Sequence, residues 1–164
     1  RLEVSLFWNE LRDLIVFDFT TQKNQNIGRA RTRGVELGWR QPLSARIALD
    51  AGYTYLDGED LTAGQPLLRR PKHRAYVSAV WHPAPSLSVS PRATFVGGRD
   101  DVDPVSFARV THPSYLRYDL FVRYDIGRFV PYARLENAAD ERYEEVRGYP
   151  APRRRYALGL QAKF

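Results

Sequence analysis

The side chains best suited to chemistry in this sequence lie near the ends of predicted strands. Arg69 ends a long segment between two strands, and Tyr143 and Tyr149 lie in the last such segment, beside Glu144 and Glu145. A guanidinium at such a position can donate hydrogen bonds to the phosphate or amide oxygens of a bulky ligand. We therefore take Arg69, Tyr143 and Tyr149 as candidate ligand contacts. The alternatives are a solvated rim arginine and tyrosines that only pack their own loop.

A second group of polar residues lies in segment 97–113, which contains Arg99, Asp100, Asp101 and Asp103. Spaced carboxylates can bind Ca²⁺, but the late glutamate of a calcium loop is missing. We therefore expect a hydrated loop here. No metal site is expected elsewhere, because the sequence has no cysteine and its three histidines lack the spacing of metal ligands.

Catalysis has no support in the sequence. There is no Gly-x-Ser-x-Gly motif and no evident histidine triad, so we expect neither an enzyme nor a cofactor. The net charge of +6 raises the possibility of nucleic-acid binding. However, the basic residues cluster mainly in 69–74 and 153–155, at strand ends. A solvated rim is the first interpretation, and contact with phosphates of an anionic membrane surface or with an anionic ligand is the alternative.

The dominant pattern is alternation with a period of two, which indicates β-strands that expose two different faces. Segment 45–55 alternates Ala, Ile, Leu, Ala, Tyr and Tyr with Arg, Ala, Asp, Gly and Thr. Segments 74–82, 87–95, 116–126 and 156–164 repeat this design, and 2–8, 35–39 and 129–136 do so more weakly. We predict eight strands.

The predicted connections alternate in length. Short ones fall at 40–44, 82–86 and 126–129, and long ones at about 17–30, 57–72, 97–114 and 139–152. This asymmetry is typical of outer-membrane β-barrels, which have tight periplasmic turns and long extracellular loops. A helical membrane protein is excluded, because the mean hydropathy is −0.48 and no apolar run approaches about 18 residues.

The apolar rows carry aromatic rings near strand ends, where such rings favour a membrane interface, so we expect these rows to meet lipid. The opposite rows carry arginine and aspartate, which fit an aqueous lumen. In the last strand, Tyr156, Leu158, Leu160 and Phe164 share the lipid face and look like a segment recognised by barrel-assembly machinery. With no initiator methionine, we expect a piece of a longer protein and a larger barrel. A complete eight-stranded membrane barrel and a soluble barrel are the alternatives.

Three stretches carry a resemblance to a known family: Asn26–Glu36, Pro66–His73, and Asn137–Tyr143 followed by Gly148–Pro150. Together they resemble the final strands of TonB-dependent receptors, most closely the vitamin B12 (cobalamin) receptors. The resemblance covers nearly all of residues 1–164. It implies a 22-stranded barrel of which this chain supplies about the last eight strands. It also implies an N-terminal plug and a TonB-binding box, neither of which is in this chain.

The resemblance further implies a function, a location and partners. The function would be active uptake of a scarce bulky ligand, cobalamin first and a ferric siderophore as the alternative, across the outer membrane of a Gram-negative cell. The partners would be TonB, through the N-terminal part, outer-membrane lipid and lipopolysaccharide, and the barrel-assembly machinery. In the cobalamin receptors the first arginine of the Leu-Leu-Arg-Arg run faces the ligand, and Arg69 holds that position here.

Overall fold

The computed structural model describes residues 1–13, 15–18, 21–26 and 28–163, and within them the protein forms one curved, nine-stranded antiparallel sheet and three separate two-stranded sheets. Its eight long strands are β1 (Leu2–Arg12), β4 (Arg29–Ser44), β5 (Ile47–Asp60), β7 (His73–Ala84), β8 (Leu87–Val96), β11 (Tyr115–Tyr124), β12 (Phe129–Glu136) and β15 (Arg155–Ala162). They pair in that order, and the short β6 (Gln65–Pro66) adds to β5. The eight predicted strands are thus confirmed.

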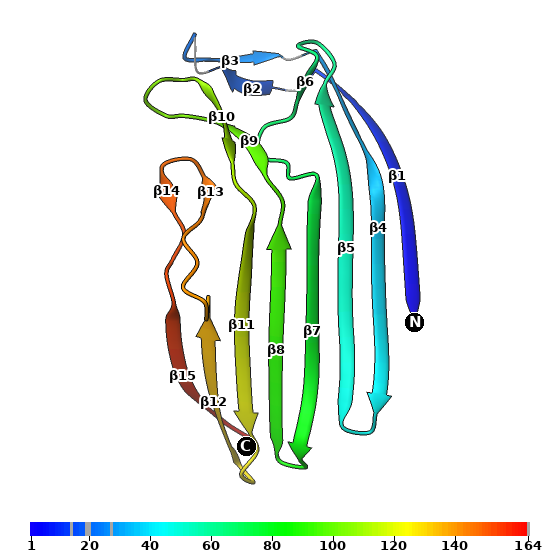
Figure 1. Ribbon diagram of the computed structural model, residues 1–164, viewed down its shortest axis with the longest axis vertical. Helices are drawn as coiled ribbons and strands as arrows, with labels where there is room; N and C mark the ends of the chain where they lie inside the picture. Colours follow the sequence, from blue (N-terminus) through cyan, green and yellow to red (C-terminus); the bar gives the residue numbers. More distant parts are fainter. Residues whose placement is uncertain (14, 19–20, 27, 164) are drawn as a thin grey trace.

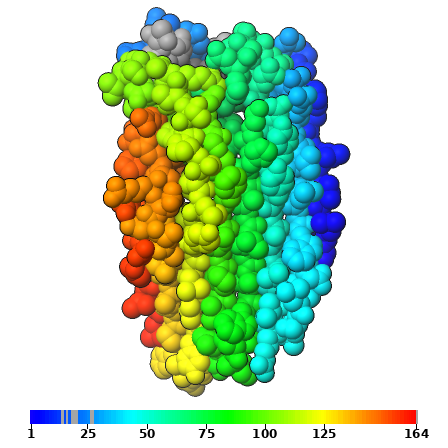
Figure 2. Space-filling model, in the orientation of Figure 1, coloured from blue at the N-terminus to red at the C-terminus, as the bar shows by residue number. Residues whose placement is uncertain are grey.

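Three hairpins extend the connections at one end of the sheet (Figure 1). They are β2 (Ile15–Asp18) with β3 (Lys23–Asn26), β9 (Arg99–Val102) with β10 (Arg109–His112), and β13 (Glu144–Val146) with β14 (Tyr149–Pro150). The opposite end has only tight turns, so the molecule is a tall wall capped at one end (Figure 2). Among the described residues, no helix is long and apolar enough to span a membrane.

The strand register places the predicted apolar rows beside one another. One continuous row runs through Val4, Leu37, Tyr53, Ala75, Phe95 and Leu116 on six neighbouring strands. Polar and small residues form the matching row of the other face, through Gly38, Gly52, Tyr76, Thr94 and Arg117. Since side chains alternate between faces along a strand, one face is apolar and the other is polar.

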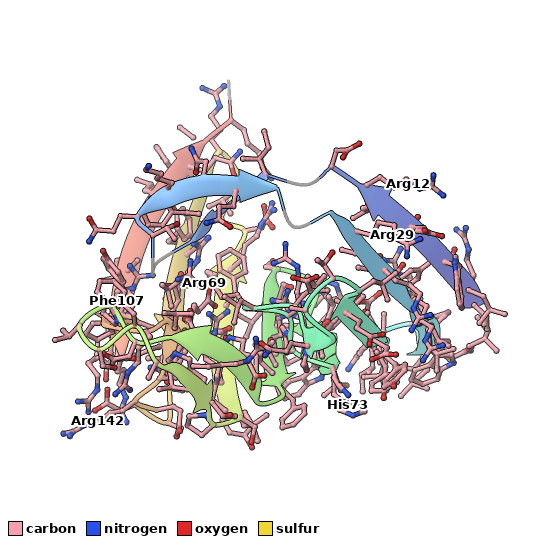
Figure 3. All side chains as sticks on the ribbon, turned by 90° about the horizontal axis from the view of Figure 1, so that it is seen from above. Arg12, Arg29, Arg69, His73, Phe107 and Arg142 are labelled. Atoms are coloured by element: carbon pink, nitrogen blue, oxygen red, sulfur yellow. The ribbon has the colours of Figure 1, made fainter. Side chains whose placement is uncertain are left out.

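Viewed from above, the sheet is an arc, and His73, which belongs to the apolar rows, points away from its hollow side (Figure 3). The convex face is therefore the apolar one, and its large side chains stay exposed: Leu6 is 77% and Leu158 is 86% accessible. A soluble domain rarely exposes so extended an apolar surface. The soluble barrel considered from the sequence would instead bury its apolar rows inside, so that alternative is wrong.

The sheet does not close on itself. β1 and β15 are the two ends of the strand order and do not pair with each other in the part of the chain that is described. A complete eight-stranded barrel would require that pairing. The arrangement is a segment of a larger barrel, as the sequence predicted.

Several predicted boundaries are wrong by a few residues. The turn expected at 40–44 lies at Ala45–Arg46, because β4 continues through Pro42 to Ser44. β4 begins at Arg29 and β5 ends at Asp60, so both extend into segments expected to be long loops, and β1 continues beyond the predicted 2–8 to Arg12. Periodicity is a poor guide there because charged residues such as Glu10, Arg31 and Glu59 replace apolar ones in the rows of the convex face.

Two glycines of β4, Gly34 and Gly38, differ in how closely other atoms approach them. A Cβ on Gly34 would lie 2.0 Å from the carbonyl oxygen of Tyr55 and 2.6 Å from the ring of Phe7. At Gly38 the nearest atom to such a Cβ is 3.7 Å away, which is ordinary contact. Gly34 therefore allows a close approach within the barrel wall, whereas Gly38 does not need to be glycine for this reason.

Candidate functional site

The buried carboxylate of Asp101 connects three of the outer segments. It accepts a hydrogen bond from Nε of Arg69 at 2.8 Å and from the backbone N–H groups of Val102 and Arg147, both at 2.8 Å. Its side chain is 0% exposed. The connection before β7, the β9–β10 hairpin and the β13–β14 hairpin are thereby joined at one point. The expectation of a hydrated loop over 97–113 is wrong at this residue, because its acceptors are satisfied by protein donors.

The electrostatics of this cluster favour ionised carboxylates. Burial alone would raise the pKa of Asp101, but the N–H of Arg147 and the guanidinium of Arg69 outweigh it and lower that pKa below its usual value. Asp103 accepts from the N–H groups of Ser106 and Val105, which lowers its pKa to about 2. Both carboxylates are therefore charged at neutral pH.

Arg69 lies at the mouth of the arc, within this cluster. It has a positive φ of 58°, its N–H donates to the carbonyl of Asp100 at 2.7 Å, and its guanidinium bonds to Asp101. Its side chain is still 40% exposed. The structure thus gives Arg69 a role in holding the loops together, and the ligand contact expected from the sequence remains a proposal.

Two further polar side chains are buried nearby. Arg99 donates from Nη2 to the carbonyl of Glu144 at 2.6 Å, which ties β9 to β13. Nε2 of His112 lies 3.5 Å from the Asp101 carboxylate. His73 instead meets the hydroxyl of Tyr53 at 2.8 Å on the convex face. Within the described residues, no group of three or more histidine or acidic side chains is placed to hold a metal ion.

Tyr143 and Tyr149 come together at a hollow of about 580 Å³ below the loops, which we call the mouth hollow. Tyr143 stacks on Tyr115 with ring centroids 3.9 Å apart, and Tyr149 is 71% exposed. The hollow is lined by Arg117, Tyr143, Glu145, Val146, Tyr149, Ala151 and Pro152. Aromatic faces beside a cation suit a bulky ligand that has both flat and anionic or amide groups.

Arg117 is a charged residue of the mouth hollow that was not among the ligand contacts predicted from the sequence. It donates to the Tyr143 hydroxyl at 3.3 Å and forms an ion pair with Asp119 at 3.0 Å. It lies on the polar face near the outer end of β11, two residues after Tyr115. The alternation predicts that Arg117 lies on the polar face near the outer end of β11. It does not predict that the segment with β13 and β14 packs against this arginine. Arg69 does not line this hollow.

In the last strand, β15, the side chains of Tyr156, Leu158 and Leu160 lie on the convex face, as the alternation predicts. Tyr156, Leu158 and Leu160 are 73%, 86% and 63% exposed, and Tyr156 continues the row of Leu135. Phe164 lies outside the described residues. Recognition of this strand by assembly machinery stays a proposal.

Comparison with known proteins agrees with this architecture. The family model described as "TonB dependent receptor-like, beta-barrel" matches residues 1–139. Solved structures also superpose: the ferric-catecholate import receptor Fiu from E. coli K12 in its closed form (18% identity, TM-score 0.78), the copper transporter OprC (19%, 0.83) and the ferripyoverdine receptor of Pseudomonas aeruginosa (18%, 0.80).

Each of these alignments covers 99% of this chain but only 25%, 28% and 25% of the respective receptor. The chain therefore spans about a quarter of the length of the solved structures that it matches. At these identities the structural likeness establishes the fold alone. The family match, which extends over most of the sequence, establishes more: this chain belongs to the TonB-dependent receptors, as part of their β-barrel.

Proposed function

We propose that the chain is part of the barrel of an outer-membrane receptor for energised uptake of a scarce, bulky ligand. The observation that carries this proposal is the mouth hollow on the concave face, under loops held together by Asp101. The outer loops and the hollow would capture the ligand. TonB, acting through the N-terminal part of the receptor, would then open a path through the barrel.

Two ligand classes are candidates. Cobalamin is implied by the resemblance of Pro66–His73, and its many amides suit donors such as Arg69. A ferric siderophore is favoured by the solved relatives, two of which are named for ferric-catecholate and ferripyoverdine. The aromatic rings of Tyr143 and Tyr149 beside Arg117 suit an anionic chelate with flat groups.

The test is direct binding by the purified full-length receptor in detergent, with cyanocobalamin and ferric enterobactin as separate probes. Tight binding of ferric enterobactin without binding of cyanocobalamin removes the cobalamin proposal, and the reverse removes the siderophore proposal. Binding of neither probe by a receptor that folds with a heat-modifiable barrel argues against uptake of either ligand.

A matched pair of variants tests the site itself. Tyr149→Ala removes a ring that is 71% exposed at the mouth hollow, and Tyr156→Ala removes one that is 73% exposed on the convex face. We expect the first to weaken binding about tenfold, which corresponds to about 1.4 kcal/mol, and the second to leave it unchanged. Arg69→Gln should also weaken binding, because the exposed guanidinium is proposed to contact the ligand.

We propose an outer-membrane location on the same grounds. The convex face would contact lipid and, at its outer end, lipopolysaccharide, and the strand with Tyr156, Leu158 and Leu160 would engage the assembly machinery. Recovery of the full-length receptor in the outer-membrane fraction, and its loss when the assembly machinery is depleted, would test this location.

A further inference from the structure

The apolar rows of the convex face end abruptly toward the loop end of the sheet. On β5 they run from Ile47 to Tyr55, close to the roughly 9–11 residues that a membrane-spanning strand needs. Beyond Trp8, Val35 and Tyr55, the next positions of the same rows on β1, β4 and β5 are charged. Aromatic rings favour the border between hydrocarbon and head groups. At the proposed membrane location, these charged rows therefore lie at the level of the outer head groups.

The charged rows contain more cations than carboxylates. Four arginines and three acids belong to them, and Nζ of Lys72 lies 3.9 Å from one of those acids, Asp57. We call the cations the outer cation band: Arg12, Arg29, Arg31, Arg33 and Lys72. The acids are Glu10, Asp57 and Glu59. Among the described residues of these rows, five cations thus stand against three carboxylates, a surplus of two positive charges.

The centre of the outer cation band is held by ion pairs and an aromatic ring. Arg31 forms an ion pair with Glu59 at 2.7 Å, and Arg33 forms one with Asp57 at 2.8 Å. Both guanidiniums also lie over the ring of Trp8, 5.3 and 5.7 Å from its centroid. Cation–π contacts of this kind fix the arginines directly above the last aromatic ring of the apolar rows.

The border of the band on β1 has the least compensated charge. Arg12 and Arg29 are directly opposite each other in the strand register (Figure 3). They share one carboxylate, Glu10, at the long distances of 3.8 and 3.7 Å. Like charges at directly opposed positions destabilise a sheet. Since the two side chains are 71% and 60% exposed, an external anion can reach both guanidiniums.

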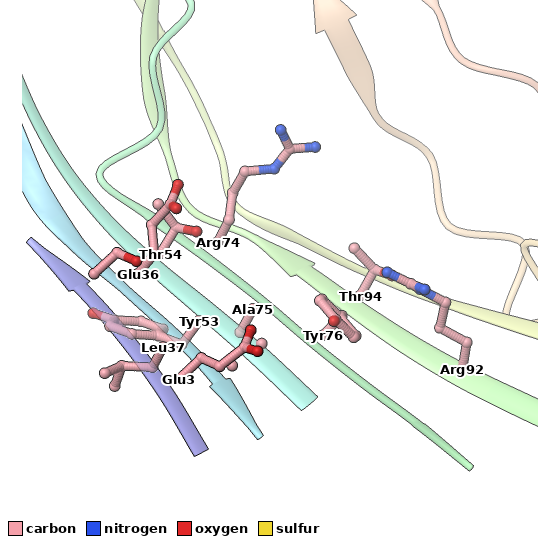
Figure 4. A pocket seen from close by; sticks show the side chains of 13 residues that line it. Glu3, Glu36, Leu37, Tyr53, Thr54, Arg74, Ala75, Tyr76, Arg92 and Thr94 are labelled. Atoms are coloured by element: carbon pink, nitrogen blue, oxygen red, sulfur yellow. The ribbon is translucent and has the colours of Figure 1, made fainter. Parts of the chain in front are cut away.

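The opposite face of the same part of the sheet shows a different balance of charge. A hollow of about 440 Å³ lies there, lined by two acids, Glu3 and Glu36, and two arginines, Arg74 and Arg92 (Figure 4). Its cations and carboxylates are equal in number. The excess of cations described above is thus a feature of the outside of the wall at its loop end.

We propose that the outer cation band is a binding site for the phosphate groups of lipid A, the membrane part of lipopolysaccharide, with Arg12 and Arg29 as its clamp. The proposal rests on the proposed outer-membrane location and assigns residues and chemistry to that contact. A phosphate between the two guanidiniums supplies the negative charge that Glu10 alone does not, through charge-assisted hydrogen bonds. The acyl chains of the same molecule lie along the apolar rows below Trp8, which distinguishes a lipid from free phosphate.

The experiment uses the purified full-length receptor in detergent, with lipid A that carries both phosphates as the probe and native mass spectrometry to measure binding. Dephosphorylated lipid A and inorganic phosphate are the comparison probes. Arg29→Gln, alone and combined with Arg12→Gln, is the test variant, and Arg29→Lys retains the charge. Arg46→Gln is the matched control, because Arg46 is an exposed arginine in the tight turn between β4 and β5, at the other end of the wall.

We expect Arg29→Gln to weaken binding of lipid A about fivefold and the combined variant to weaken it about 25-fold, because each arginine near an anionic membrane surface contributes a similar factor. Arg29→Lys should retain most of the affinity, and Arg46→Gln should bind as the wild type does. All variants should keep a heat-modifiable barrel, since the substituted side chains are exposed. Dephosphorylated lipid A should bind weakly and equally to all of them.

Other outcomes separate the site from the location on which it rests. Wild-type affinity in the combined variant, or equal binding of phosphorylated and dephosphorylated lipid A by the wild type, overturns the phosphate site and leaves the outer-membrane location standing. An equal loss in Arg46→Gln also overturns it, because binding would then follow net charge alone. So does displacement of lipid A by inorganic phosphate at equal concentration. Recovery of the receptor outside the outer-membrane fraction argues instead against the location itself.

Discussion

The barrel wall and the outer loop cluster are stabilised in different ways. In the wall, the same arrangement recurs on every strand: backbone pairing in register, an apolar row outside and a polar row inside. In the loop cluster, one buried carboxylate, Asp101, is the meeting point of three segments far apart in sequence. The wall should therefore tolerate many substitutions that respect the two faces, whereas the cluster depends on individual residues.

The strongest test of this difference is a charge placed on the convex face. Leu158→Arg should destabilise the folded receptor by about 2–4 kcal/mol in lipid, because the guanidinium would enter hydrocarbon. Ala157→Arg, on the next residue and the opposite face, is the control and should cost little. Denaturant unfolding of the full-length receptor in liposomes measures both, and equal costs would contradict the assignment of the faces.

Removal of the central carboxylate should loosen the cluster and spare the wall. Asp101→Ala leaves the N–H groups of Val102 and Arg147 without their acceptor, a local loss of about 1–3 kcal/mol. Hydrogen exchange of β9, β13 and β14 should become about 10–100-fold faster, with no change in β5 or β8. Asp100→Ala is the control, because Asp100 pairs with Arg109 at a more exposed position. Uniform acceleration across the wall would show that the two regions unfold together.

Within the wall itself, two glycines four residues apart should respond differently. Gly34→Ala forces its Cβ against a backbone carbonyl and should cost about 1–3 kcal/mol, as overpacking does. Gly38→Ala has room and should be neutral or slightly stabilising, because alanine restricts the unfolded chain. The same unfolding assay measures both. A comparable loss at both positions would mean that register, not close approach, sets the cost.

Acid should loosen the loop around Asp103, and this is the smallest of the expected effects. The pKa of Asp103 is lowered to about 2 in the folded state, chiefly by the N–H groups of Ser106 and Val105. A group whose pKa falls on folding stabilises the fold above its unfolded pKa, near 3.8, and loses that contribution as pH falls toward 2. A spin label at Val105→Cys should gain mobility over this range. In the Asp103→Asn background the mobility should no longer change with pH there.

The alternation in the sequence was sufficient to predict the strands of the wall. Within each strand, the alternation of apolar and polar residues by itself assigns the side chains to the two faces of the sheet. Residues such as Leu37 and Tyr53 need no distant information to be assigned to the apolar side, and the register then matched them. The candidate site was predicted only in part. The sequence singled out Tyr143 and Tyr149, which both line the mouth hollow, and their contact with a ligand stays a prediction. The hydrogen bonds of Asp101 with Arg69 and Arg147 join segments separated by more than 30 residues. Local pattern carries no signal for such contacts.

The open sheet has a consequence for how this portion of the receptor can exist in a bilayer. The free sides of β1 and β15 each present a column of peptide N–H and C=O groups that no strand of the described structure satisfies. In hydrocarbon, where water is absent, each such group costs several kcal/mol. At the proposed membrane location, both borders must therefore pair with other strands before or during insertion, so that this arc would be stable there only as one sector of a closed barrel.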